Sequence, residues 1–263
     1  LGVVGQDFRR EDWDLLASRP LDLSGVSRLQ GETFRWHGRY QSEGDDAITI
    51  STDLNVLMDF VADVPEKFLQ TEIFLCANLH PRLQEDLLVQ INSKLLIVDT
   101  MNKWIDEERE QLCRVLSAAN ITVLNSTELA MLTGHSSVEE GAESLLAGEC
   151  LEGLEGPDIV VVKLAAKGAV AFGPWGVIHC LGREADVVID PTGCGDVVAG
   201  AMAWEWDRIC GQRRFGASGW VMAACLIGAG VSAWLRRYDV ALAIVAIGAI
   251  GVYGTALICR RGE

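Results

Sequence analysis

The sequence predicts an α/β fold in which a mostly parallel central sheet is covered by helices on both faces, with a small β-hairpin lid. Short, continuously apolar segments typical of buried strands recur at residues 73–77, 95–99, 121–124 and 159–163. Between them, apolar residues recur every three or four positions, as they do on one face of a helix. Buried strands that alternate with amphipathic helices indicate a parallel sheet with both faces covered.

The remaining elements follow from the same periodicities. The predicted helices are residues 11–18, 81–91, 104–118, 126–132, 137–147 and 197–206. Residues 1–5 predict a short strand, residues 33–52 predict a hairpin with a polar turn, and residues 169–180 predict another hairpin. Alternation in the first hairpin places Arg35, His37 and Arg39 on one face and aromatic residues on the other. Because ligands of open α/β sheets bind at the carboxyl ends of the strands, we expect the functional residues there.

Charge is unevenly distributed along the chain. The net charge is −15, and residues 208–263 carry seven Arg against two acidic residues, a net +5, which leaves −20 on residues 1–207. An acidic body argues against nucleic acid as a partner, because binding to phosphate backbones requires stripes of Lys and Arg. The eight Cys include no Cys-x-x-Cys pair and no zinc-like spacing, which is typical of thiols in a cytoplasmic protein.

A different composition begins after residue 207. Residues 216–235 and residues 240–259 are each uncharged, and each is about long enough to cross a bilayer of ~30 Å. Three interpretations stay open: a two-helix membrane hairpin, buried helices of a soluble domain, or a shifted reading frame. In the first, the Arg residues that flank the pair favour a body on the cytoplasmic face of the membrane. We therefore expect an α/β domain at residues 1–207 and an apolar helical tail at residues 208–263.

The segment Asp-Pro-Thr-Gly-Cys-Gly-Asp at residues 190–196 carries the strongest functional signal. Gly193 and Gly195 permit a tight turn and a close approach to a ligand, and the predicted helix that follows directs its first N–H groups at an anion. Asp196, in the first turn of that helix, could accept a proton from a substrate hydroxyl. The alternative is a glycine-rich helix cap with an ordinary Asp.

This segment resembles the Asp-Thr-Thr-Gly-Ala-Gly-Asp signature of the phosphofructokinase-B (ribokinase-like) carbohydrate kinases, and the resemblance covers about residues 1–207. It implies a ribokinase-like fold and transfer of a phosphoryl group from ATP to a hydroxyl of a sugar. It also implies that Asp196 is the base and that the amides of Gly193, Cys194 and Gly195 form the anion hole. Thr192 would lie beside the nucleotide, and Cys194 stands where the family usually has Ala.

Two further segments resemble the nucleotide side of the same family. Asn125-Ser126-Thr127-Glu128 is similar to the family's Asn-x-x-Glu motif, which implies that Asn125 and Glu128 organise Mg²⁺ and the phosphates of ATP. The same residues also fit a capping box at the start of a helix, and the two interpretations are compatible. The stretch around Lys163 and Gly168 resembles the strand and turn that border the nucleotide. A solvated Lys at a strand end is the alternative for Lys163.

The substrate side rests on two segments. The hairpin at residues 33–52 resembles the family's β-lid over the sugar, which implies that Arg35 and Arg39 reach the substrate and that the lid is a possible homodimer contact. A solvated outer face is the alternative. Asp99 and Asn102 follow a buried strand and are expected to line the phosphate and substrate region, unless they form a plain turn with Asn102 as a helix cap.

Two departures from the family bear on activity. A strand with a substrate-binding Asp and a Gly-Gly motif normally precede the matched part, and neither stands before Leu1, so we expect that an amino-terminal portion is absent. After Trp206, the apolar tail replaces the helices that complete the adenine pocket. The alternative function is therefore a non-catalytic nucleotide-binding remnant, with or without a membrane anchor. A membrane protein whose acidic domain only recruits partners is a further alternative.

Overall fold

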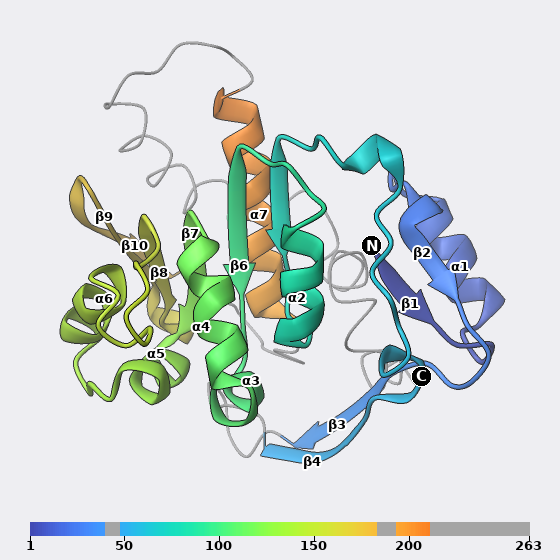
Figure 1. Ribbon diagram of the computed structural model, residues 1–263, viewed down its shortest axis with the longest axis horizontal. Coiled ribbons are helices and arrows are strands. Elements are labelled where there is room, and N and C mark those ends of the chain that lie inside the picture. Colours follow the sequence, from blue (N-terminus) through green and yellow to red (C-terminus); the bar gives the residue numbers. More distant parts are fainter. Residues whose placement is uncertain (40–47, 183–192, 211–263) are drawn as a thin grey trace, which may run out of the picture. The chain divides into compact units, whose positions relative to one another are not determined.

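The computed structural model describes residues 1–39, 48–182 and 193–210, with the side chains of the last range described through Trp204. The chain divides into two compact units (Figure 1). Of the described residues, the first unit holds 1–68 and 193–197, and the second holds 69–182 and 198–210.

The second unit is built on a six-stranded sheet with the order β10-β9-β8-β7-β6-β5. Its strands are β5 (Ile73–Cys76), β6 (Leu95–Asp99), β7 (Ile121–Asn125), β8 (Ile159–Lys163), β9 (Gly168–Gly173) and β10 (Gly176–Leu181). The first four run parallel, and β9 and β10 add an antiparallel hairpin at one edge. The predicted α/β class with a mostly parallel sheet is therefore confirmed.

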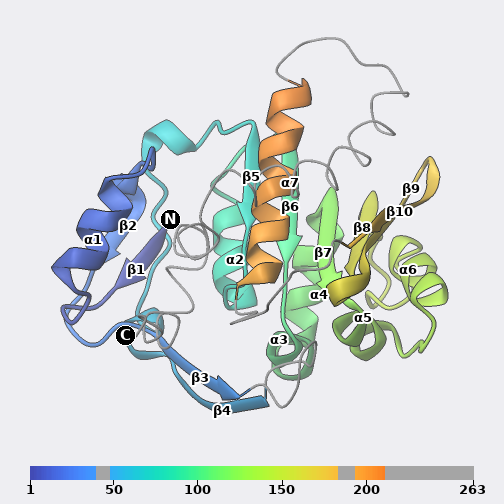
Figure 2. The same cartoon turned by 180° about the vertical axis from the view of Figure 1, so that it is seen from behind.

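Helices cover both faces of this sheet. They are α2 (Pro81–Leu88), α3 (Asn102–Glu107), α4 (Arg109–Ala118), α5 (Ser126–Thr133), α6 (Val138–Leu146) and α7 (Cys194–Cys210). Alternate residues of each central strand face opposite sides: Leu96 and Val98 belong to the core beneath α3–α6, whereas Ile97 packs in the core that includes Met202 of α7. Figure 2 shows α7 crossing the face of the sheet opposite to α2–α6.

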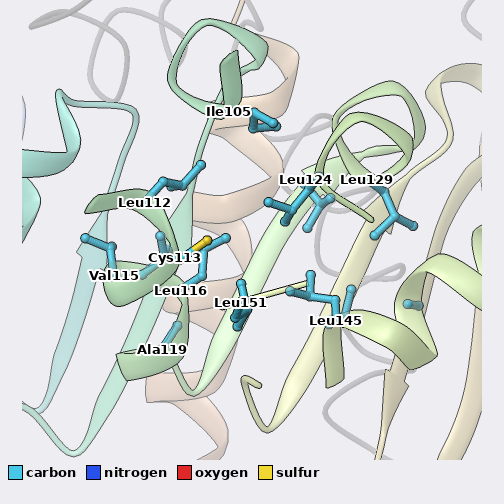
Figure 3. Packing of buried hydrophobic residues seen from close by; sticks show 14 of the residues in the cluster. Ile105, Leu112, Cys113, Val115, Leu116, Ala119, Leu124, Leu129, Leu145 and Leu151 are labelled. Carbon is cyan, nitrogen blue, oxygen red and sulfur yellow. The ribbon is translucent and has the colours of Figure 1, made fainter. Parts of the chain in front are cut away.

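The larger core lies between the sheet and the helices α3–α6. Side chains from α4, α5 and α6 converge there on Leu124 of β7, with Leu116 and Leu145 fully buried (Figure 3). Ile97 and Val98 of β6 are also inaccessible to solvent, although they face opposite sides. This double-sided burial explains why the central strands are apolar at every position and show no alternation.

Local signals account for several helix ends. His80 precedes α2, where Pro81 occupies the first turn, and Ser137 accepts a hydrogen bond from the N–H of Glu140 at the start of α6. Gly134, with φ +79°, ends α5 in the left-handed conformation.

The single helix predicted at residues 104–118 is wrong in one respect, because the structure contains α3 and α4 there. Glu108 leaves the helical region (φ −132°, ψ 38°) and separates them. The sequence does not signal the break, since Glu is a good helix former and no Gly or Pro is nearby.

The first unit contains small elements. The strand β1 (Gly2–Val4) pairs in parallel with β2 (Val26–Arg28), a strand that the sequence analysis missed, and α1 (Arg10–Ala17) packs Leu16 against Val4 and Phe8. The predicted lid is an antiparallel pair, β3 (Arg35–Arg39) and β4 (Ile48–Asp53), with an irregular register between His37 and Gly38. Four short 3₁₀ helices complete the described structure: Leu23–Gly25, Asn55–Leu57, Glu66–Phe68 and Ala165–Lys167.

The tail at residues 216–259, predicted as a possible membrane hairpin, lies outside the described residues. Across the helices that are described, α1 through α7, none has the length and apolarity that a bilayer crossing requires.

A hydrogen-bond network centred on Asp7 joins the end of β1 to the start of the lid. Oδ1 of Asp7 accepts hydrogen bonds from the N–H and the hydroxyl of Thr33, both at 2.7 Å, and Oδ2 accepts one from Arg35 at 2.9 Å. The hydroxyl of Thr33 in turn accepts the N–H of Gly5 at 2.9 Å. Burial acts to raise the pKa of Asp7, but the hydrogen bonds from Thr33 and Arg35 outweigh it, so the pKa is lowered.

This network predicts a pH-dependent stability. Because the pKa of Asp7 is lower in the folded state, its stabilisation is complete above the unfolded value of 3.8 and is lost as the pH falls through the folded value. The difference in free energy of unfolding between the native protein and Asp7→Asn should therefore be largest above about pH 5 and shrink toward about pH 2. Urea denaturation across this range measures it, and a difference that stays constant would contradict the assignment.

Candidate functional site

The glycine turn lies in the first unit, where α7 begins. Gly193 adopts φ +80°, which the Cβ of other residues disfavours, and its carbonyl accepts the N–H of Val197 at 3.0 Å as the helix starts. Cys194 is exposed and Asp196 is partly buried in the first turn. The first N–H groups of a helix have no intrahelical acceptor, so this turn can present amides to an anion. Thr192 lies outside the described residues.

Three of the predicted residues meet at one edge of the sheet in the second unit. Asp99, Asn125 and Lys163 are the last residues of β6, β7 and β8, and Asn125 is the register partner of Lys163. Lys163 Nζ lies 3.2 Å from Asp99 Oδ1, and the two side chains are only 17% and 5% exposed. Lys163 is therefore not the solvated strand-end Lys that the sequence left as an alternative.

Asn125 and Glu128 form a complete capping box at the start of α5. Asn125 Oδ1 accepts the N–H of Glu128 at 2.8 Å, and Glu128 Oε2 accepts the N–H of Asn125 at 2.7 Å. The predicted cap is confirmed. A carboxylate and an amide oxygen held at this strand end are compatible with Mg²⁺, because that ion prefers oxygen ligands, retains several waters and needs few protein ligands. Within the described ranges, His, Cys, Asp and Glu side chains do not gather in threes that could hold a metal.

The segment after β6 is held by side chains that the sequence analysis did not assign. Asn78 donates to Met101 Sδ at 3.0 Å and accepts from Trp104 Nε1 at 2.7 Å. Asn102 itself is exposed and accepts the N–H of Lys103 at 3.0 Å; the helix cap is Met101, so the alternative of Asn102 as cap is wrong. The predicted substrate residue Asn102 thus makes a local contact at the start of α3.

His80 and Gln84 fix the neighbouring strand end. His80 Nδ1 accepts the N–H of Arg82 at 3.2 Å and Nε2 lies 3.4 Å from Glu108, so both ring nitrogens make structural contacts. Gln84 of α2 donates to the carbonyls of Ala77 at 2.9 Å and Asp99 at 3.3 Å. Nothing in the sequence distinguishes Gln84 from other polar residues of an amphipathic helix. Its fully buried position depends on the docking of α2.

Gly168 turns the chain from β8 into β9 with φ +101°. A Cβ at this position would lie 2.0 Å from the carbonyl oxygen of Cys180 and 2.3 Å from the N atom of Gly182. Glycine is therefore required by the close approach of β10, independently of any contact with a nucleotide.

On the lid, Arg35, His37 and Arg39 are exposed on one face, as the alternation predicted. Arg35 Nη2 lies 2.9 Å from Asp7 and 3.8 Å from Glu32, and the hydrogen bond to Asp7 raises the pKa of its guanidinium. Arg35 is thus paired within the first unit, and Arg39 ends the described part of β3.

A mostly parallel α/β sheet with polar residues at its strand ends and a glycine turn that opens a helix are both typical of phosphotransferases. The family model described as pfkB family carbohydrate kinase matches residues 1–237. The chain belongs to this family of sugar kinases, which are phosphotransferases with an alcohol group as acceptor. The match extends beyond the 1–207 expected from the motifs.

Solved structures show the same fold. A protein from E. coli described as a ribokinase II, in complex with ATP and Mg²⁺, has a TM-score of 0.67 and 22% identity over 95% of this chain and 81% of that one. A fructokinase from Vibrio cholerae O395 with bound fructose, ADP and calcium has a TM-score of 0.65 and 18% identity over 98% and 80%. An aminoimidazole riboside kinase from Salmonella enterica, bound to its riboside and an ATP analogue, has a TM-score of 0.63 and 18% identity over 97% and 81%. A comparison with curated proteins gave no match.

The geometry at Gly168 generates a prediction on stability. Gly168→Ala should lower the free energy of unfolding by about 3 kcal/mol or more, because a left-handed φ and a backbone clash act together. Gly134→Ala is the matched control: its φ is +79° and nothing described lies within 4 Å of the new Cβ, so about 1 kcal/mol is expected. Denaturant unfolding of both variants checks this, and equal losses would contradict the clash.

Proposed function

We propose that this chain transfers the γ-phosphoryl group of ATP to a hydroxyl of a sugar or sugar-like substrate, with Asp196 as the base. The substrate oxygen attacks the γ-phosphorus, the bond to the β,γ-bridging oxygen breaks, and ADP leaves. The hydroxyl proton passes to the Asp196 carboxylate. The observation that carries the proposal is the turn at Gly193, with Asp196 in the first turn of α7, in a chain of the pfkB family.

The same turn supplies the electrostatic part of the proposal. Amides of Gly193, Cys194 and Gly195 would bind the oxygens of the transferring phosphoryl group, with Thr192 beside the nucleotide. Negative charge develops on those oxygens as the reaction proceeds, and fixed N–H dipoles at a helix start stabilise it without reorganisation. Cys194 participates through its backbone, so the replacement of the family's usual Ala leaves this role unaffected.

Nucleotide and metal contacts are proposed for the second unit. Glu128 and Asn125 would hold Mg²⁺, which when bound neutralises phosphate charge. The capping box supports this role because it fixes both side chains at the carboxyl end of β7. Lys163 is proposed to meet a phosphate, and Gly168 to shape the turn that borders the nucleotide.

The substrate is proposed to be a sugar or a sugar-containing molecule. Among structures with this fold, one holds fructose and another holds a riboside. Arg35 and Arg39 on the lid are proposed to contact the sugar, and the predicted substrate region around Asp99 and Asn102 is proposed to contribute polar groups. Arg35 would have to retain or exchange its contact with Asp7 to do so.

Further assignments stay predictions. A homodimer through the lid is supported by Ile48 and Ile50 of β4, which are 48% and 52% exposed. The proposed domain boundary at residue 207, the cytoplasmic location and a membrane contact through residues 216–259 rest on the sequence.

Asp196→Asn tests the base. This change keeps the shape of the side chain but cannot accept a proton, so kcat should fall by roughly 10²–10⁴-fold while the affinity for MgADP changes little. Sugar-dependent ADP release and calorimetric titration measure the two quantities. A rate near that of the native protein would rule out Asp196 as the base.

Glu128→Gln separates the cap from the metal site. Gln also completes a capping box, so the free energy of unfolding should stay within about 0.5 kcal/mol of the native value. The loss of the carboxylate should raise the Mg²⁺ concentration required for half-maximal activity by roughly tenfold or more. Glu128→Ala, which removes both functions, is the control and should lose stability as well; an unchanged Mg²⁺ dependence in Glu128→Gln would contradict the metal role.

The same assays decide the alternative function. A non-catalytic remnant would be stabilised against heat by MgATP and would release no ADP with any sugar tested. If nucleotides have no effect on stability, both the kinase and the nucleotide-binding remnant are excluded, and a domain that only recruits partners is favoured.

A further inference from the structure

The ion pair between Asp99 and Lys163 connects strands that are not neighbours. The sheet order places β7 between β6 and β8. Adjacent strands lie about 4.8 Å apart, so the backbones of β6 and β8 are separated by roughly 10 Å. Lys163 Nζ nevertheless lies 3.2 Å from Asp99 Oδ1. The Lys163 side chain therefore extends across the carboxyl end of β7, the strand that ends at Asn125.

The carboxylate of Asp99 is fixed from several directions. Its Oδ1 also accepts the N–H of Thr100 at 3.0 Å, and the Asp99 carbonyl accepts a hydrogen bond from the buried Gln84 at 3.3 Å. With 5% of its side chain exposed, Asp99 cannot exchange the Lys163 ammonium for water without a large desolvation cost. Asp99 therefore stays paired with Lys163.

A buried hydroxyl beside Asp99 lacks a described hydrogen-bond partner. The Thr100 hydroxyl is buried and has no hydrogen-bond partner among the described residues. Buried polar groups in native proteins are normally satisfied, so a ligand or ordered water is expected beside it. Thr100 follows Asp99 directly, at the same end of the sheet.

From these contacts we infer that Asp99 is a positioning residue: it holds the Lys163 ammonium over the end of β7, where that ammonium binds a phosphate of the nucleotide, and Asp99 does not itself contact the sugar. This inference rests on the proposed function and revises the role that the sequence suggested for Asp99.

Two competing interpretations predict different results. If the pair serves stability alone, its loss changes the melting temperature and leaves nucleotide affinity unaltered. If Asp99 mainly cancels the charge of Lys163, its removal tightens the binding of an anionic nucleotide. If Asp99 positions Lys163, its removal weakens nucleotide binding, and only when Lys163 is present.

The test is a double-mutant cycle on the full chain with Asp99→Asn, Lys163→Met and the double variant. Calorimetric titration with MgADP gives the dissociation constant of each protein. Lys163→Met should bind roughly 10–100-fold more weakly, since a charge-assisted hydrogen bond is lost. Asp99→Asn should bind several-fold more weakly, and in the Lys163→Met background the same change should alter the dissociation constant by less than about twofold.

An exposed ion pair at the opposite, amino-terminal end of the parallel strands provides the control. Glu72 and Lys94 precede β5 and β6, and their side chains are 64% and 79% exposed. Glu72→Gln and Lys94→Met should leave MgADP affinity unchanged and the melting temperature within about 2 °C. By contrast, Lys163→Met leaves a buried carboxylate without its counter-ion and should lower the melting temperature by roughly 6–20 °C.

The outcomes distinguish a failure of this inference from a failure of the proposed function. Native protein that binds MgADP, together with tighter or unchanged binding by Asp99→Asn, overturns the positioning role and leaves the kinase proposal intact. Native protein that does not bind MgADP overturns both. Should Lys163→Met fail to fold, the double variant, which retains neither buried charge, is compared with Asp99→Asn instead. If the two bind MgADP with equal affinity, Lys163 binds no phosphate and the inference is overturned.

Discussion

The strands β6, β7 and β8 are buried on both faces, and the rest of the second unit depends on this. Helices α3–α6 cover one side and α7 the other, so a polar side chain within these strands would be desolvated on either face. Polar residues of the strands are therefore concentrated where the strands end. Asp99, Asn125 and Lys163 occupy those ends, which is why the candidate nucleotide site lies at the carboxyl edge of the sheet.

Motifs in both units combine a local structural role with a proposed chemical role. The capping box of Asn125 and Glu128 begins α5 and also fixes two oxygens that suit Mg²⁺. Gly193 permits the turn into α7, and in the proposed function the amides at this turn would bind an anion. A motif of this kind is ambiguous when it is considered by itself, because the local role and the functional role require the same residues in the same geometry.

Electrostatics limits how an acidic protein binds an anionic nucleotide. With a net charge of −15, general attraction is unfavourable, and binding must rely on local groups. In the proposed function, helix amides would contribute without net charge, and Lys163 would contribute a cation that is largely shielded from solvent and paired with Asp99. Burial strengthens such a contact because the effective dielectric constant is lower away from water.

Apolar runs and capping residues allowed the sequence by itself to determine the parallel sheet, the lid hairpin and the start of α5 and α6, since these depend on neighbours in the chain. The glycine turn likewise identified the family. The break at Glu108, the strand β2 and the partners of Asp99 were decided by the tertiary structure. Lys163 lies 64 residues from Asp99 and Gln84 lies 15, so only the docking of strands and helices brings these groups together. The sequence predicts which polar residues lie at strand ends, but the partner of each side chain depends on the order of the strands in the sheet.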